Sequence, residues 1–180
     1  MKCAVIMPVG PGHAALALDA QDSVRAAFGA APGRFSALEI IAVDDTEAKL
    51  GRSLARNQGV ADAVKNGADW IFFLDADDIM HGYAFAAATP FLDHYDAVWG
   101  AIAELGPDEE SGELRQEQLA EIHGIEQLLT CDPYGLLQMG HIVKAGIAAA
   151  TPFDTALDAG EDFDYYLRRS EVHTSELQSH

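Results

Sequence analysis

Short apolar runs alternate with helical patterns over the first half of the chain. Residues 3–7, 38–43 and 70–74 are almost entirely apolar, which is typical of strands covered on both faces of a sheet. Residues 14–28 are dominated by helix formers, and residues 50–64 carry apolar side chains at helical spacing. Because helices of this length connect the strands, we expect parallel neighbours with right-handed crossovers, and therefore an α/β fold.

Proline and glycine indicate where these elements end. Pro8 cannot donate to a sheet ladder, so we expect the first strand to end there. Gly29 and Gly67 follow the helical patterns and are expected to stop the two helices.

The second half of the chain gives a less regular pattern. Residues 83–92 are predicted to form a helix and residues 96–102 a fourth strand. Residues 115–130 predict one or two amphipathic helices, and residues 138–143 a short strand that returns toward the others. Residues 160–168 begin a helix with carboxylates at its N-terminus, where the helix dipole favours negative charge.

Polar clusters follow each of the first three predicted strands. These clusters are residues 8–12, the pair Asp44 and Asp45, and residues 75–78. Ligands of parallel α/β sheets bind outside the carboxyl ends of the strands. The sequence therefore predicts a single binding site at this edge of the sheet.

Asp75 and Asp77 are the candidate metal ligands within that edge. They lie two residues apart directly after the apolar run 70–74, where the chain leaves the regular strand. Two carboxylates suit a hard cation such as Mg²⁺ or Mn²⁺, and they leave coordination positions open for water and substrate phosphates. The alternative is a solvated acidic turn after a buried strand.

Composition restricts the classes of partner. The chain has 180 residues, 49% of them hydrophobic and 22% charged, which suits one compact domain. Its formal net charge of −18 disfavours nucleic acid and anionic lipid, so an anionic substrate would need a metal ion or a local basic cluster. Cys3 and Cys131 form no disulfide framework, and no apolar run reaches membrane-spanning length. We expect a soluble, cytoplasmic protein without a membrane span.

The last residues differ in character from the rest. Residues 169–180 closely resemble the translation of a common sequencing adapter. We therefore expect the domain to comprise residues 1–168, to be incomplete at its C-terminus, and to be followed by a non-native tail.

Five ordered motifs together resemble the family 2-type inverting glycosyltransferases, which have a GT-A fold. Each motif is weak alone, but their order and spacing are fairly specific, and they extend over almost all of residues 3–168. The motifs are Met7-Pro8, Val43-Asp44-Asp45, Ala55-Arg56-Asn57-Gln58-Gly59, Leu74-Asp75-Ala76-Asp77-Asp78, and Glu161-Asp162 with Arg168 downstream. The resemblance implies a Rossmann-like, mostly parallel central sheet flanked by helices.

The resemblance also implies a set of site residues. Asp162 would be the general base, and Asp75 and Asp77 would bind Mn²⁺ or Mg²⁺. Arg56 would hold Asp44 or reach a phosphate. The donor would be a nucleotide-diphosphate sugar, such as a UDP-sugar, and the acceptor a hydroxyl of a glycan, a lipid-linked molecule or a small molecule. The implied nucleotide-binding residues are Pro8, Val9, Asp44, Asp45, Arg56, Asn57, Asp75 and Ala76.

The sequence is also compatible with other functions. Gly10 and Gly12 follow a strand and precede a helix, as in NAD(P)-binding oxidoreductases, although Asp44 lies well beyond the roughly twenty positions typical of that fingerprint. Asp75 and Asp77 would also suit a metal-dependent phosphohydrolase. A third alternative is a module that binds a sugar nucleotide without catalysing transfer. His141 is expected to be a hydrogen-bonded structural histidine.

Overall fold

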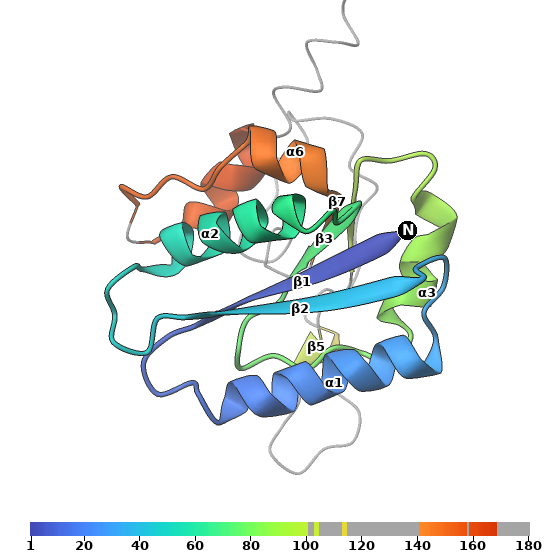
Figure 1. The fold of residues 1–180 in the computed structure, drawn as a ribbon, viewed down its shortest axis with the longest axis horizontal. Coiled ribbons are helices and arrows are strands. Elements are labelled where there is room, and N and C mark those ends of the chain that lie inside the picture. The colour runs from blue at the N-terminus through green and yellow to red at the C-terminus, as the bar shows by residue number, and fades with distance from the viewer. Residues whose placement is uncertain (101–102, 105–112, 115–140, 158, 169–180) are drawn as a thin grey trace, which may run out of the picture.

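The computed structural model describes residues 1–100, 103–104, 113–114, 141–157 and 159–168 (Figure 1). The helices predicted for residues 115–130, the start of the strand predicted for residues 138–143, and the tail of residues 169–180 lie outside the described residues, as does Cys131.

A five-stranded sheet forms the centre of the molecule, with the strand order β2-β1-β3-β7-β4. β1 pairs in parallel with both β2 and β3, while β7 runs antiparallel to β3 on one side and β4 on the other. The predicted α/β fold, with a central sheet flanked by helices, is therefore confirmed, and β2, β1 and β3 form the parallel part of the sheet. The strands are β1 (Lys2–Val9), β2 (Ala37–Asp44), β3 (Trp70–Phe73), β4 (Ala97–Trp99) and β7 (His141–Lys144).

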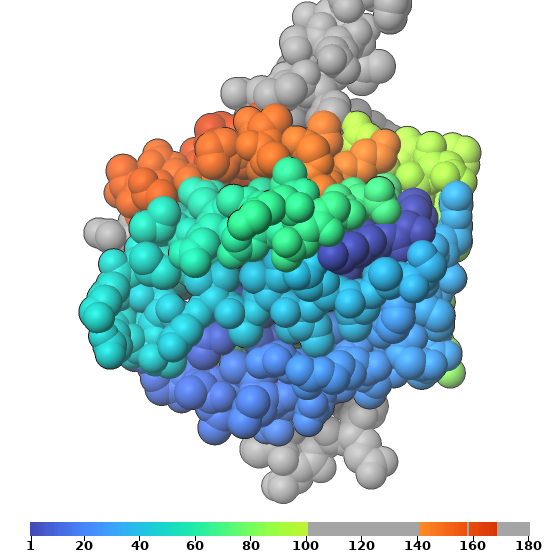
Figure 2. Space-filling model, viewed as in Figure 1, coloured from blue at the N-terminus to red at the C-terminus, as the bar shows by residue number. Residues whose placement is uncertain are grey.

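Helices cover both faces of this sheet. Helix α1 (Leu16–Ala30) lies on one face, and α2 (Arg52–Lys65) and α6 (Ala145–Ala150) pack side by side on the other (Figures 1 and 2). Residues 161–168 are also helical and contribute Tyr165 and Tyr166 to the core on the α2 side. The remaining elements are α3 (Ala84–Ala88), the 3₁₀ helix η1 (Thr89–Phe91), and the two-stranded pair β5 (Ala103–Glu104) and β6 (Glu113–Leu114).

The alternation of side chains along β1 divides the core between the two faces. Cys3, Val5 and Met7 pack with α1, whereas Ala4 and Ile6 pack with α2 and the C-terminal helices. Successive strand residues point to opposite faces, and both faces of β1 are buried. This explains the continuous apolar run in the sequence.

The expected element ends at Pro8 and Gly29 are wrong by one or two residues. β1 continues through Pro8 to Val9, still paired with β2. The missing N–H of Pro8 is tolerated because β3 pairs with β1 only as far as Ile6, so Pro8 has no β3 residue to which it would donate. Helix α1 runs through Gly29 to Ala30, and Pro32 follows shortly after.

The helix predicted for residues 83–92 is instead a short α-helix followed by a 3₁₀ turn. Pro90 lacks the N–H that would continue the α-helical ladder, so α3 ends at Ala88 and η1 takes over. Gly67, by contrast, ends the α2 segment with a φ of 76°, as predicted.

Candidate functional site

The three predicted clusters meet at the carboxyl edge of the parallel strands. Val9 is in register with Asp44 across β1 and β2, and the next N–H, that of Asp45, donates to the Val9 carbonyl at 2.8 Å. On the other side of β1, the N–H of Leu74 donates to the Ile6 carbonyl at 3.1 Å. The loops after β1 and β2 lie at the left of Figure 1, where helix α2 also begins.

Asp44 and Asp45 have different surroundings although they are neighbours. Asp44 is exposed, and its carboxylate accepts hydrogen bonds from the Thr46 N–H at 2.9 Å and the Thr46 hydroxyl at 2.8 Å. These hydrogen bonds, the N–H first, lower the pKa of Asp44. The carboxylate therefore remains charged at the open end of β2.

Asp45 is buried and holds the loop that leads into α2. Its carboxylate accepts from the main-chain N–H groups of Lys49 at 2.7 Å, Leu50 at 2.8 Å and Gly51 at 2.8 Å. The hydrogen bond from Leu50 is the largest influence, and together with those from Gly51 and Lys49 it lowers the pKa of Asp45 against the opposing effect of burial. Its oxygens face the protein's own main chain.

The acidic motif after β3 presents its carboxylates unequally. Ala76 is buried, Asp75 has a side chain that is 39% exposed, and Asp77 is exposed. A turn closed by the Asp78 N–H on the Asp75 carbonyl at 3.1 Å shapes the segment. Asp77 is thus the more accessible of the two candidate metal ligands.

Arg56 is the most deeply buried charge among the described residues, with 1% of its surface exposed. Its guanidinium donates from Nη2 to Asp75 Oδ1 at 2.8 Å and from Nη1 to Glu161 Oε1 at 2.9 Å. Burial lowers the pKa of Arg56, but Asp75 and Glu161 outweigh it, so the net direction is upward. Arg56 therefore binds Asp75 and Glu161 and not Asp44, which was one of its two expected partners.

Asn57 connects α2 to a segment far along the chain. Its amide donates to the Phe153 carbonyl at 2.9 Å, and its carbonyl oxygen accepts from the Phe153 N–H at 2.8 Å. The Phe153 ring then lies 5.5 Å from the Arg56 guanidinium carbon. In this structure Asn57 therefore positions the chain around Phe153 and has its polar atoms engaged there.

The helical residues 161–168 bring the last motif to the same region. Gly160 has a φ of 75°, and its carbonyl accepts from the Asp164 N–H at 3.0 Å to close the first helical turn. Glu161 points inward and is 3% exposed, whereas Asp162 is half-buried and accepts from the Phe163 N–H at 2.9 Å. The sequence motif predicts both acids at this site, but it does not predict that Glu161 is the partner of Arg56.

The acidic edge suits an open two-carboxylate metal site. Arg56 donates to Oδ1 of Asp75, so Oδ2 of Asp75 and the carboxylate of exposed Asp77 are the candidate oxygen ligands at this edge. Within the described ranges no group of three or more His, Cys, Asp or Glu side chains could hold a metal ion. Any further ligands would have to come from water or substrate, as is usual for Mg²⁺.

His141 is a structural residue, as expected. It is fully buried in β7, and its Nδ1 forms a 2.8 Å hydrogen bond with the hydroxyl of Tyr166. Its ring stacks on Trp99 with a centroid separation of 5.6 Å. His141 therefore joins β7, β4 and helical residues 161–168.

Solved structures share this fold at low sequence identity. The S. aureus TarS fragment 1–349 in complex with UDP has 16% identity and a TM-score of 0.66, covering 94% of this chain and 55% of that one. The same fragment in complex with UDP-GlcNAc gives 16% identity and 0.66, covering 94% of this chain and 53% of that one. The longer S. aureus TarS structure gives 17% and 0.66, covering 94% of this chain and 33% of that one.

This chain thus spans about half the length of the TarS fragments that it matches. A comparison with protein-family models and one with curated proteins give no match. In the part of the chain that the structure describes, no helix combines the length and apolar character needed to cross a membrane.

Proposed function

We propose that this protein is a metal-dependent inverting glycosyltransferase that moves a sugar from a nucleotide-diphosphate donor to an acceptor hydroxyl. One observation carries the proposal: Arg56 anchors Asp75 at the end of β3 and leaves Asp77 exposed, at the edge where β1 and β2 also end. The likeness of the fold to TarS structures with bound UDP and UDP-GlcNAc supports a UDP-sugar as donor.

The nucleoside would bind at the ends of β1 and β2. Asp44 offers a charged, exposed acceptor for the N–H of the base or the hydroxyls of the ribose. Pro8 and Val9 would contact the base through the last residues of β1, while Asp45 would act indirectly by fixing the following loop.

The diphosphate would bind next to the acidic motif. Asp77 and Oδ2 of Asp75, the oxygen that Arg56 does not contact, would hold Mg²⁺ or Mn²⁺, and Ala76 lies between them. The ion would act as a Lewis acid that neutralises the leaving diphosphate. Arg56, being paired with two carboxylates, would orient Asp75 rather than contact a phosphate.

Asp162 would be the general base. Its carboxylate would take the proton from the acceptor hydroxyl as that oxygen forms its bond to the anomeric carbon and the bond to the diphosphate breaks. A single displacement of this kind inverts the anomeric configuration. The position of Asp162 beside Glu161, which is tied through Arg56 to the metal motif, supports this role.

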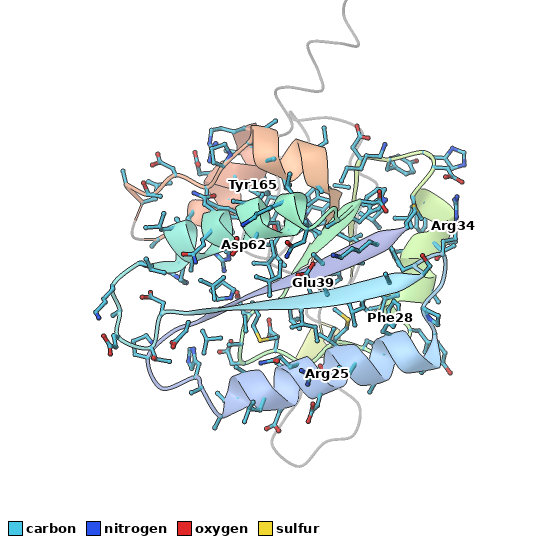
Figure 3. The ribbon with its side chains drawn as sticks, in the orientation of Figure 1. Arg25, Phe28, Arg34, Glu39, Asp62 and Tyr165 are labelled. Carbon is cyan, nitrogen blue, oxygen red and sulfur yellow. The ribbon has the colours of Figure 1, made fainter. Side chains whose placement is uncertain are left out.

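Calorimetric titration with UDP tests the donor and metal sites together. We expect UDP to bind wild-type protein with Mn²⁺ present and to bind Asp77→Asn at least about tenfold more weakly, because a metal ligand is lost. The matched control is Asp62→Asn, the same change further along α2 than Arg56 (Asp62 is labelled in Figure 3), which should bind as the wild type does. Binding of NAD with no binding of UDP would instead support the dinucleotide reading of Gly10 and Gly12.

Turnover tests the base. With UDP-GlcNAc as donor and release of UDP as the readout, Asp162→Asn should retain UDP binding and lose about 100-fold or more in turnover. Asp164→Asn, on the same helix, should retain both. Unchanged turnover in Asp162→Asn would refute the base assignment, and turnover absent even from the wild type would favour a binding module.

A further inference from the structure

The first acid of the Glu161-Asp162 pair has no role in the proposed chemistry, yet it is the more buried of the two. Glu161 is 3% exposed and accepts from Arg56 Nη1 at 2.9 Å. The guanidinium of Arg52 lies beside the same oxygen, with Nε at 3.3 Å. A carboxylate buried at this depth needs such compensation.

The Arg56 guanidinium joins Glu161 to the metal motif. It spans the two carboxylates, with Glu161 on one nitrogen and Asp75 on the other. The planar fork of arginine fixes both directions at once. Phe153 lies against the guanidinium and is held in turn by both amide atoms of Asn57, so Arg56 is confined on several sides.

The balance of charge around Arg56 depends on Glu161. The guanidiniums of Arg52 and Arg56 face the carboxylates of Glu161 and Asp75, so the four side chains sum to zero. If Glu161 were neutral, only the charge of Asp75 would oppose the two guanidiniums, and the same four side chains would sum to +1. The edge would then attract a divalent cation less strongly, because the net charge beside it would be one unit more positive.

We propose that Glu161 is a positioning residue for the metal site: by sharing Arg56 with Asp75, it fixes the orientation of Asp75 and preserves its negative charge for the cation. Glu161 touches neither the donor nor the acceptor in this role. The inference rests on the proposed function, since it assumes that Asp75 and Asp77 bind the metal.

Calorimetric titration of Mn²⁺ in the presence of UDP tests this role. Glu161→Gln keeps the size of the side chain and the acceptor oxygen but removes the charge, so its Mn²⁺ affinity should fall by about three- to tenfold. Asp164→Asn is the matched control, with the same change of charge one helical turn away on a carboxylate paired with Arg168 at 2.6 Å. Its Mn²⁺ affinity should equal that of the wild type.

A second readout separates positioning from catalysis. At saturating Mn²⁺, turnover of Glu161→Gln with UDP-GlcNAc should return to within about twofold of wild type, since the variant lacks only metal affinity. Asp162→Asn should not recover at any Mn²⁺ concentration. If Glu161→Gln does not melt cooperatively, Glu161→Asp replaces it, because the charge is kept but moved away from Arg56, and its Mn²⁺ affinity should still fall.

The outcomes distinguish the two proposals. Wild-type protein that binds UDP with Mn²⁺, together with Glu161 variants whose Mn²⁺ affinity matches that of Asp164→Asn, would overturn the role of Glu161 and leave the proposed function standing. Wild-type protein that binds neither UDP nor Mn²⁺ would overturn both.

Discussion

Asp45 uses both of its carboxylate oxygens to hold the loop that leads into α2. Its two oxygens gather three consecutive N–H groups, those of Lys49, Leu50 and Gly51, before α2 begins. Gly51 has a φ of 79°, so the chain turns sharply at the point where Asp45 holds it. Asp45 therefore fixes the residue at which α2 starts, and with it the position of Arg56 on that helix.

The lowered pKa of Asp45 predicts a pH-dependent contribution to stability. A carboxyl group with a depressed folded-state pKa stabilises the fold above its ordinary value of 3.8 and loses that contribution as the pH falls through the folded value. In Asp45→Asn only one oxygen remains, so the Gly51 N–H, which donates to Oδ2, loses its partner. The variant should be less stable at pH 7, and the difference should narrow below about pH 4.

Urea unfolding of wild type and Asp45→Asn between pH 7 and 3 measures this difference directly. The other acids, including Asp44, contribute to both proteins and cancel. Asp62→Asn serves as the control for loss of one charge. A difference between wild type and Asp45→Asn that stayed constant across this range would show that the ionised carboxylate is not what holds the loop.

For individual residues, the sequence predicts which side chains lie at the candidate site but not which contacts each of them makes. Asp44 and Asp45 are equivalent in a strand-end pattern, and only the loop geometry separates the exposed acid from the buried one. Asn57 and Phe153 are 96 positions apart, and no local pattern pairs them. Glu161 was detectable as half of a motif, but whether it or Asp162 points inward depends on how the helix packs.

Helix α2 is the element that joins the sheet to the site. It packs on β1, β2 and β3 and also on α6, so its position is fixed from several directions. The close approach to β1 occurs at Gly59, where a Cβ would lie 2.4 Å from Ile6 Cγ2. Ile6 is fully buried and has little room to give way.

The packing at Gly59 predicts that alanine, the better helix former, destabilises the protein at this position. Alanine is favoured over glycine within helices by about 1 kcal/mol, yet Gly59→Ala should destabilise the protein by about 1–3 kcal/mol because α2 or Ile6 must move. Gly29→Ala in α1 is the matched control, since a Cβ there meets nothing within 4 Å, and it should be neutral or stabilising by up to about 1 kcal/mol.

Thermal and urea unfolding of the two variants measure both effects. Because α2 carries Arg56, Gly59→Ala should also weaken UDP binding in the presence of Mn²⁺, whereas Gly29→Ala should not. A Gly59→Ala protein as stable as Gly29→Ala would mean that the contact between α2 and β1 is looser than 2.4 Å implies.

Elements with strong local patterns were predictable, and those fixed by tertiary pairing were not. The parallel strands β1, β2 and β3 and helices α1 and α2 follow from apolar runs and helical spacing. β7 lies between β3 and β4 and runs antiparallel to both. This pairing joins strands that are far apart in the sequence. A strand near residues 138–143 was expected, but its neighbours and direction carry no local signal.

For the molecule as a whole, charge is the dominant surface property. The formal net charge is −18, with 29 acidic against 11 basic Lys and Arg residues. Several of the basic side chains are committed to individual acids, as in Lys2 with Glu39 at 2.7 Å and Lys144 with Asp96 at 2.6 Å. The unpaired excess is negative, so the folded state experiences self-repulsion that unfolding relieves.

Screening of this repulsion predicts that salt stabilises the fold. The Debye length shortens from about 30 Å at 0.01 M to about 10 Å at 0.1 M, so NaCl added over that range should raise the melting temperature by about 2–5 °C at pH 7. The Asp77→Asn variant should show the same rise, because screening is general and needs no cation site. Near the sequence pI of about 4.4 the net charge vanishes, and the effect of salt should disappear with it. A melting temperature that fell with salt at pH 7 would show instead that attractive pairs such as Lys2 with Glu39 outweigh the overall repulsion.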